Sequence, residues 1–110
     1  MLSVLILTKN EEQDLPECLS SVTWSSDIVV FDSCSTDRTR EIAASAGARV
    51  IQKPFDNWAS HQNWGLRNIT FRYPWIFYID ADERLTPEAA AELQAIARSP
   101  DPDCVAYRIR

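Results

Sequence analysis

The sequence predicts an α/β domain with a mostly parallel sheet and helices on both faces. Short, nearly continuous apolar runs recur along the chain, as is typical of strands that are covered on both sides. Between these runs lie segments in which apolar residues are spaced by three and four positions, the pattern of amphipathic helices. Strands that alternate with helices in this way pair in parallel through right-handed crossovers.

The first two predicted strands flank a helix. Residues 2–7 (LSVLIL) form an apolar run, and the helical spacing begins at Asp14, with Pro16 near the first turn. Residues 28–31 (IVVF) form the second buried strand, which ends in Asp32. The polar residue therefore lies where the strand leaves the sheet.

A second helix and a third strand follow. Ser35 or Thr36 can cap a helix that runs through Ala46, because their hydroxyls accept hydrogen bonds from free backbone N–H groups. Gly47 suits the end of that helix, since glycine adopts a left-handed conformation without strain. Residues 48–52 (ARVIQ) form the third strand.

The next predicted unit is a loop, a helix and a fourth strand. The loop covers residues 53–58 and the helix covers roughly residues 59–69, although Gly65 in its interior lowers helical propensity. Residues 75–79 (WIFYI) form the fourth buried strand. This strand runs directly into an acidic segment.

The last predicted elements complete a single domain over residues 1–110. Thr86 caps a helix that has Pro87 at its first position. Residues 99–103 (SPDPD) end that helix, and residues 104–109 are expected to form a final strand.

Composition narrows the function. The formal net charge of −5 disfavours general binding to nucleic acid, because phosphate backbones are repelled. Cys18, Cys34 and Cys104 are odd in number and far apart, and His61 is the single histidine, so neither a disulfide framework nor a zinc site is expected. No signal peptide and no membrane span is apparent, so we expect a cytoplasmic protein.

Polar side chains follow three of the predicted strands: residues 8–11, 32–35 and 80–83. Because the carboxyl ends of parallel strands meet at one edge, we expect these groups to form one ligand site there.

Asp80 and Asp82 form the sharpest pair in this constellation. Two residues apart at the end of an extended segment, their side chains point to the same side. Neighbouring carboxylates repel each other unless a cation lies between them, and Mg²⁺ or Mn²⁺ suits a site of few carboxylates completed by water and phosphates. The alternative is an acidic turn that only favours the start of the next helix.

Several other residues admit two interpretations. Asp37 is explained by its place at a helix start, whereas Asp32 ends a buried strand and is interpreted as functional. Lys9 either meets a phosphate or is solvated. His61 is expected to be an ordinary helix residue, and Trp58 is the aromatic residue to test for stacking on a sugar ring. Ordinary turn chemistry remains an alternative for the polar residues after the first strand.

Four segments in order resemble the family 2 glycosyltransferases: LTKNEE, FDSCSTDRT, NWASHQNWGL and YIDADERLTPE. They are most similar to the β-1,4-glucosyltransferase-like subgroup linked to lipopolysaccharide core assembly, and the similarity covers nearly the whole chain. The resemblance implies a GT-A-type, Rossmann-like fold that binds a nucleotide-diphosphate sugar, most simply a UDP-sugar.

The resemblance also implies site residues. It assigns nucleotide-sugar binding to Thr8, Asn10, Glu11, Asp32, Gln62 and Asp80. Within this set Asp32 is expected to contact the base or ribose, and Asp80 with Asp82 to form the D-x-D motif that holds Mg²⁺ or Mn²⁺. Glu83 belongs to the same motif without an assigned role.

Three positions depart from the family pattern. Cys34 replaces a usual glycine, so a turn that favours positive φ is expected to be made in another way. Gln62 replaces a usual Arg or Lys and removes a positive charge expected near the diphosphate. Ser33 replaces an Asp that is common in relatives.

The resemblance further implies that these residues are the donor-binding half of an inverting enzyme. The acceptor-binding part and the general base are expected beyond Arg110, so the chain alone should be inactive or weakly active. A glycan or lipid-linked acceptor of the cell envelope is implied, with peripheral membrane association at the inner face of the cytoplasmic membrane through the missing portion.

Other classes fit less well. A haloacid-dehalogenase-like phosphatase carries its D-x-D after the first strand, and a receiver domain needs an acidic pair where Thr8, Lys9 and Asn10 stand. A catalytically inactive nucleotide-binding or interaction module remains the non-enzymatic alternative.

Overall fold

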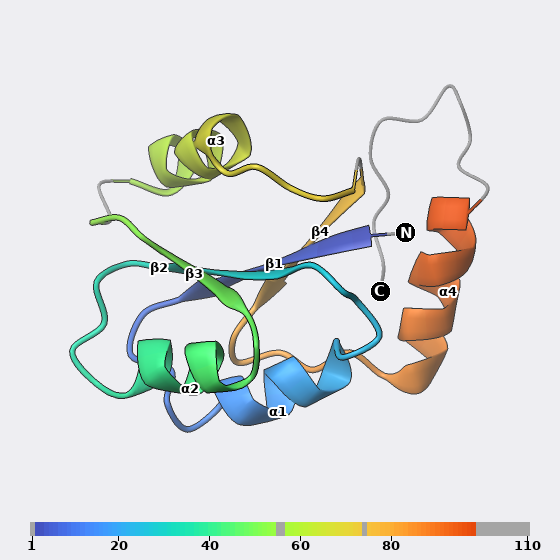
Figure 1. Cartoon of the computed structure of the whole chain (residues 1–110), viewed down its shortest axis with the longest axis horizontal. Helices are drawn as coiled ribbons and strands as arrows, with labels where there is room; N and C mark the ends of the chain where they lie inside the picture. The colour runs from blue at the N-terminus through green and yellow to red at the C-terminus, as the bar shows by residue number, and fades with distance from the viewer. Residues whose placement is uncertain (1, 55–56, 74, 99–110) are drawn as a thin grey trace.

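The computed structural model describes residues 2–54, 57–73 and 75–98 (Figure 1). The strands are β1 (Leu2–Thr8), β2 (Ile28–Asp32), β3 (Arg49–Gln52) and β4 (Trp75–Asp80). The helices are α1 (Leu15–Ser21), α2 (Thr39–Ser45), α3 (Trp58–Asn68) and α4 (Pro87–Arg98). The break at 99–103 and the strand at 104–109 that the sequence predicts lie outside the described residues.

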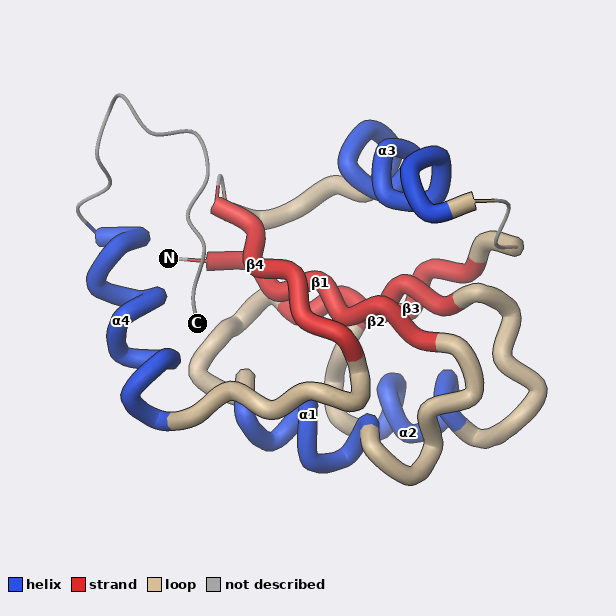
Figure 2. Tube along the Cα trace, turned by 180° about the vertical axis from the view of Figure 1, so that it is seen from behind, coloured by secondary structure: helices blue, strands red, loops and turns tan. Residues whose placement is uncertain are grey.

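The four strands form one sheet in the order β3-β2-β1-β4, and every pairing is parallel. Helices α1 and α2 cover one face and α3 covers the other, in both the front and the rear views (Figures 1 and 2). The predicted α/β class with helices on both faces is confirmed. Among the described residues, no helix is both long and apolar enough to cross a bilayer.

The alternating side chains of the strands supply two apolar layers. Val4, Ile6 and Val30 face α1 and α2, where they pack against buried side chains of those helices. Leu5 and Phe31 point the other way and pack beneath α3. Because successive residues of a strand face opposite sides, continuous apolar runs such as 2–7 are needed to fill both layers.

Local end signals explain most helix boundaries. Pro16 lies in the first turn of α1, and the hydroxyl oxygen of Thr86 accepts a hydrogen bond from the Ala89 N–H at the start of α4. Gly47 ends α2 with φ 85°, a conformation that costs glycine little. These three predictions are confirmed.

The predicted start of α2 is wrong. Neither Ser35 nor Thr36 caps the helix, which begins at Thr39. Ser35 instead donates its backbone N–H and its hydroxyl to Asp32, and the Thr36 N–H binds Asn10, so these residues form a loop tied to the strand ends. The sequence could not predict this arrangement, because Ser and Thr hydroxyls form hydrogen bonds with nearby backbone groups in helix caps and in loops alike.

Asp37 prepares the helix start, as its position suggested. Its Oδ1 accepts a hydrogen bond of 3.0 Å from the backbone N–H of Thr39, the first residue of α2. Its carboxylate also accepts a hydrogen bond from the Thr39 hydroxyl. The helix-start interpretation is therefore confirmed.

Gly65 in the middle of α3 is explained by packing. A Cβ atom at this position would lie 3.0 Å from the Phe31 ring, which is fully buried on the sheet. The same ring stacks on His61 at a centroid distance of 4.1 Å and on Trp64 at 5.6 Å. Glycine thus lets α3 approach the sheet closely.

Replacing Gly65 by alanine should destabilise the domain despite the better helix propensity of alanine. Overpacking typically costs about 1–3 kcal/mol, and the helix recovers at most about 1 kcal/mol, so we expect a net loss of about 1 kcal/mol in the free energy of unfolding. Urea denaturation measures it, with the exposed Ser60→Ala as the control on the same helix. A Gly65→Ala variant that is more stable than wild type would mean that the Phe31 ring can move aside without loss of packing energy.

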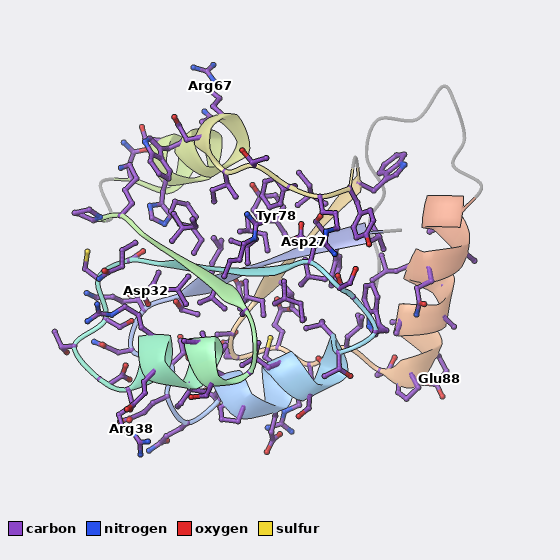
Figure 3. All side chains as sticks on the ribbon, in the orientation of Figure 1. Asp27, Asp32, Arg38, Arg67, Tyr78 and Glu88 are labelled. Carbon is purple, nitrogen blue, oxygen red and sulfur yellow. The ribbon has the colours of Figure 1, made fainter. Side chains whose placement is uncertain are left out.

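An ionic cluster that the sequence analysis did not identify joins the amino ends of the strands. The buried carboxylate of Asp27 accepts hydrogen bonds from Ser3 Oγ at 2.6 Å, from the Arg72 N–H at 2.8 Å and from the Arg49 guanidinium at 2.8 Å. These partners come from β1, from β3 and from the segment before β4. Asp27 therefore connects three parts of the chain, at the end of the sheet opposite Asp32 (Figure 3).

Candidate functional site

A pocket of about 780 Å³ lies at the carboxyl edge of the sheet. It is lined by residues at or just after the carboxyl ends of the four strands, together with one residue of α3: Leu7, Thr8, Lys9, Glu11, Ser33, Cys34, Pro54, His61, Asp80, Ala81 and Asp82. The predicted convergence of three strand ends is thus present. Its volume is in the range of small-molecule sites.

One wall of the pocket is acidic. Burial raises the pKa of Asp80, and the charges of Glu83 and Asp82 raise it further. Burial likewise raises the pKa of Glu11, followed by the charges of Asp82, Asp14, Asp37 and Asp80. Negative charge is therefore concentrated here at an electrostatic cost that a bound cation would relieve.

The donor set fits a weakly enclosed hard cation rather than a protein cage. Within residues 2–54, 57–73 and 75–98, no three His, Cys, Asp or Glu side chains are grouped closely enough to enclose a metal. Asp80 and Asp82 nevertheless line the same pocket. Mg²⁺ and Mn²⁺ commonly use one or two carboxylates and take their remaining ligands from water and phosphate.

Asp32 does not line the pocket. Its side chain is fully buried, and it accepts hydrogen bonds from Thr8 Oγ1 at 2.7 Å, Ser35 N–H at 2.8 Å and Ser35 Oγ at 2.5 Å. Arg40 Nε lies 3.9 Å from the same carboxylate. In this structure Asp32 organises the loops after β1 and β2, and the expected contact with a base or ribose stays a prediction.

Asn10 also joins these loops. It adopts φ 52°, and its side-chain oxygen accepts a hydrogen bond of 2.8 Å from the Thr36 N–H while its own N–H donates to Ser35 Oγ. Glu11 is fixed through its backbone, which donates to Thr39 Oγ1 at 2.9 Å. Thr8 and Glu11 line the pocket, whereas Asn10 does not.

Lys9 is held at the rim by the loop after β2. Its Nζ donates to the backbone carbonyls of Ser33 and Cys34, both at 3.0 Å. Cys34 itself adopts φ 60°, so the expectation that the turn is made in another way is wrong. The left-handed conformation is retained by a residue with a Cβ, at a cost on the order of 1–2 kcal/mol.

Ser33 and His61 form a second, uncharged part of the pocket lining. Ser33 Oγ lies 3.2 Å from His61 Nε2, and both residues are buried in the pocket wall. His61 is packed against Phe31, as the ordinary interpretation expected, yet it also lines the pocket. The alternation of side chains along a strand could have identified Ser33 as a pocket residue. Continued past β2, it places Ser33 on the same face of the sheet as Phe31, toward α3, and Asp32 on the other face.

Two further sequence candidates lie on α3. Gln62 directly follows His61, and Trp58 is the first residue of the helix. The structure describes their backbone positions but not their side chains. Their expected contacts with a donor therefore stay predictions.

Comparison with known proteins shows the family to which the chain belongs. A sequence profile for glycosyl transferase family 2 matches residues 3–110. The chain belongs to glycosyl transferase family 2. An uncharacterized glycosyltransferase of Rickettsia bellii is 36% identical over 111 residues, and the match covers 99% of this chain and 37% of that protein. The lipopolysaccharide core biosynthesis glycosyltransferase LpsC of Rhizobium meliloti is 34% identical, with 98% and 41% covered.

This family 2 chain thus spans less than half the length of these relatives. Solved glycosyltransferases share its fold. The mannosyltransferase PcManGT of Pyrobaculum calidifontis, in complex with GDP-Man and Mn²⁺, superposes with a TM-score of 0.71 at 23% identity over 92% of this chain and 32% of its own. TarS of S. aureus in complex with UDP-GlcNAc also gives 0.71 at 23% identity, over 88% and 31%. The GT-A-type fold expected from the sequence is confirmed.

Proposed function

We propose that this chain is the donor- and metal-binding part of an inverting glycosyltransferase. The donor is a nucleotide-diphosphate sugar, most simply a UDP-sugar, and the acceptor is a hydroxyl group of a cell-envelope glycan, free or lipid-linked. Residues 1–110 form one domain with this role, and the protein acts in the cytoplasm or at the inner face of its membrane.

The observation that carries the proposal is the pairing of Asp80 and Asp82 in a pocket that opens at the sheet edge. A divalent cation held there neutralises charge that develops on the diphosphate as the sugar departs. Thr8 and Glu11 border the same pocket from the end of β1. Asp32 and Asn10 keep the bordering loops in place through the hydrogen bonds described above.

Two further lining residues are suited to the uncharged part of the donor. Ser33 and His61 present a hydroxyl and an imidazole to the pocket, and neither repels a nucleoside. With Asp80 and Asp82 on the acidic side, the diphosphate would lie toward β4 and the nucleoside toward β2 and α3.

Relatives support the proposal by what they bind. Structures of similar fold are complexes with GDP-Man and Mn²⁺ and with UDP-GlcNAc, and LpsC is a lipopolysaccharide core enzyme by name. Since the chain spans 37% to 41% of the relatives described above, we assign the acceptor surface and the general base to chain beyond Arg110. Membrane association would also come from that portion.

Titration of UDP with and without Mn²⁺ tests the proposal. The protein carries a net charge of −5 and the pocket is acidic, so UDP alone should be repelled. Relief of two charge contacts of about 1 kcal/mol each predicts that Mn²⁺ tightens UDP binding roughly 30-fold. Calorimetry measures both affinities, with EDTA reversing the gain.

Two other outcomes of this titration are informative. Equal affinity with and without Mn²⁺ would contradict the cation role, and no binding under either condition would favour an interaction module without catalysis. Sugar transfer by the 110-residue chain alone should be weak or absent, because an inverting transfer needs a base to deprotonate the acceptor.

A further inference from the structure

The acidic segment after β4 is a closed turn. The Glu83 N–H donates to the Asp80 carbonyl at 2.9 Å, and the Asp80 N–H donates to Glu83 Oε1 at 3.1 Å. The backbone and side chain of Glu83 thus satisfy both backbone groups of Asp80. The same reciprocal use of a glutamate three residues away stabilises helix starts in the capping box.

The middle of this turn is anchored in the core beneath α1. Ala81 is only 2% exposed and belongs to the apolar layer that also contains Cys18. The Cys18 thiol lies 3.7 Å from the Asp80 carbonyl oxygen as a weak donor. Ala81 is thus held in the core, while the exposed Asp80 and Asp82 on either side of it line the pocket.

The next residue is tied down as well. The Arg84 guanidinium forms an ion pair with Glu17 of α1, and neither residue lines the pocket. Of the four residues of the turn, Glu83 is the one whose side chain is directed back onto the backbone instead of lining the pocket. Its carboxylate therefore differs in role from those of Asp80 and Asp82.

We propose that Glu83 is a positioning residue for the cation site, acting through the Asp80 N–H and not as a metal ligand. The inference rests on the proposed function, because it concerns how Asp80 and Asp82 are presented to the cation. An open turn would let the two carboxylates separate, so that binding would have to reassemble them. The closed turn presents them on one side before the cation arrives.

Two substitutions separate the hydrogen bond from the charge. Glu83→Gln keeps a side-chain oxygen at the same reach, so it can still accept from the Asp80 N–H, whereas Glu83→Ala removes the acceptor. In metal-free protein, loss of a hydrogen bond of about 1 kcal/mol predicts that the Asp80 amide exchanges with solvent roughly fivefold faster in Glu83→Ala. Glu83→Gln should exchange at close to the wild-type rate. Amide exchange followed by NMR measures both rates.

Mn²⁺ affinity, measured by the paramagnetic signal of the free ion, supplies the second readout. Loss of an outer-sphere positioning contact typically weakens metal binding by about 10–100-fold, which we expect for Glu83→Ala. Glu83→Gln loses one nearby charge, so it should weaken binding by no more than about fivefold, and high salt should reduce that loss. The exposed Glu92→Gln on α4 is the control for a change in net charge.

The outcomes are distinct. If Glu83→Gln loses as much affinity as Glu83→Ala, Glu83 is a ligand or a charge and the inference is overturned. Wild-type affinity in Glu83→Ala also overturns it. If the wild-type chain binds no Mn²⁺ at all, the proposed function fails first, and the role of Glu83 toward a cation fails with it.

Discussion

The Asp82→Asn variant is expected to lose Mn²⁺-dependent binding of UDP. An amide oxygen keeps the shape of the side chain but carries no charge, so one of two anionic ligands of a hard cation is removed. We expect the Mn²⁺ affinity to fall roughly 100-fold, at the upper limit of the range typical of outer-sphere substitutions, while the fold persists because Asp82 is exposed. Calorimetry with Mn²⁺, followed by UDP, measures the loss.

Asp14→Asn is the matched control for this loss. It makes the same chemical change at an exposed residue that precedes α1 and does not line the pocket. Its effect on Mn²⁺ affinity should be several-fold at most, through long-range charge that salt screens. Equal losses in Asp14→Asn and Asp82→Asn would mean that net charge, and not a site at the end of β4, attracts the cation.

The largest effect on stability is expected at the other end of the sheet, for Asp27→Ala. This change strips the half-exposed Arg49 guanidinium, the buried Ser3 hydroxyl and the Arg72 N–H of their shared acceptor. Loss of hydrogen bonds to a charged acceptor typically costs about 1.5–3 kcal/mol, which we expect here in the free energy of unfolding. Urea denaturation checks the value, and Glu92→Gln should stay within about 0.5 kcal/mol of wild type.

The Asp27 cluster also predicts a dependence on pH. Burial alone would raise the pKa of Asp27, but hydrogen bonds from Ser3, Arg72 and Arg49 and the Arg49 charge outweigh it and hold the pKa below the ordinary value of 3.8. A lowered folded-state pKa means that the contribution is complete above the unfolded pKa and is lost as pH falls through the folded pKa. Wild type should therefore lose stability in acid more steeply than Asp27→Ala. Parallel acid profiles would contradict this role.

Local sequence patterns determined most of the architecture and the place of the site. Continuous apolar runs indicate strands that are buried on both sides of the sheet. Because these strands alternate with amphipathic helices along the chain, they are expected to pair in parallel. Acids that follow a buried strand must emerge at its carboxyl end. For this reason the pocket position and the presence of Asp80 and Asp82 in it could be predicted before the fold was known.

The tertiary structure alone decided which polar side chains line the pocket and which hold the chain together. Asp32 is a carboxylate at a strand end, as expected of a site residue, but it accepts hydrogen bonds from Thr8 and Ser35. Its neighbour Ser33 lines the pocket instead. Gly65 is required by the distant Phe31 ring, and Asp27 depends on partners up to 45 residues away. Periodicity reports the face on which a residue lies, whereas the hydrogen-bond partner of a buried polar group is set by segments remote in sequence.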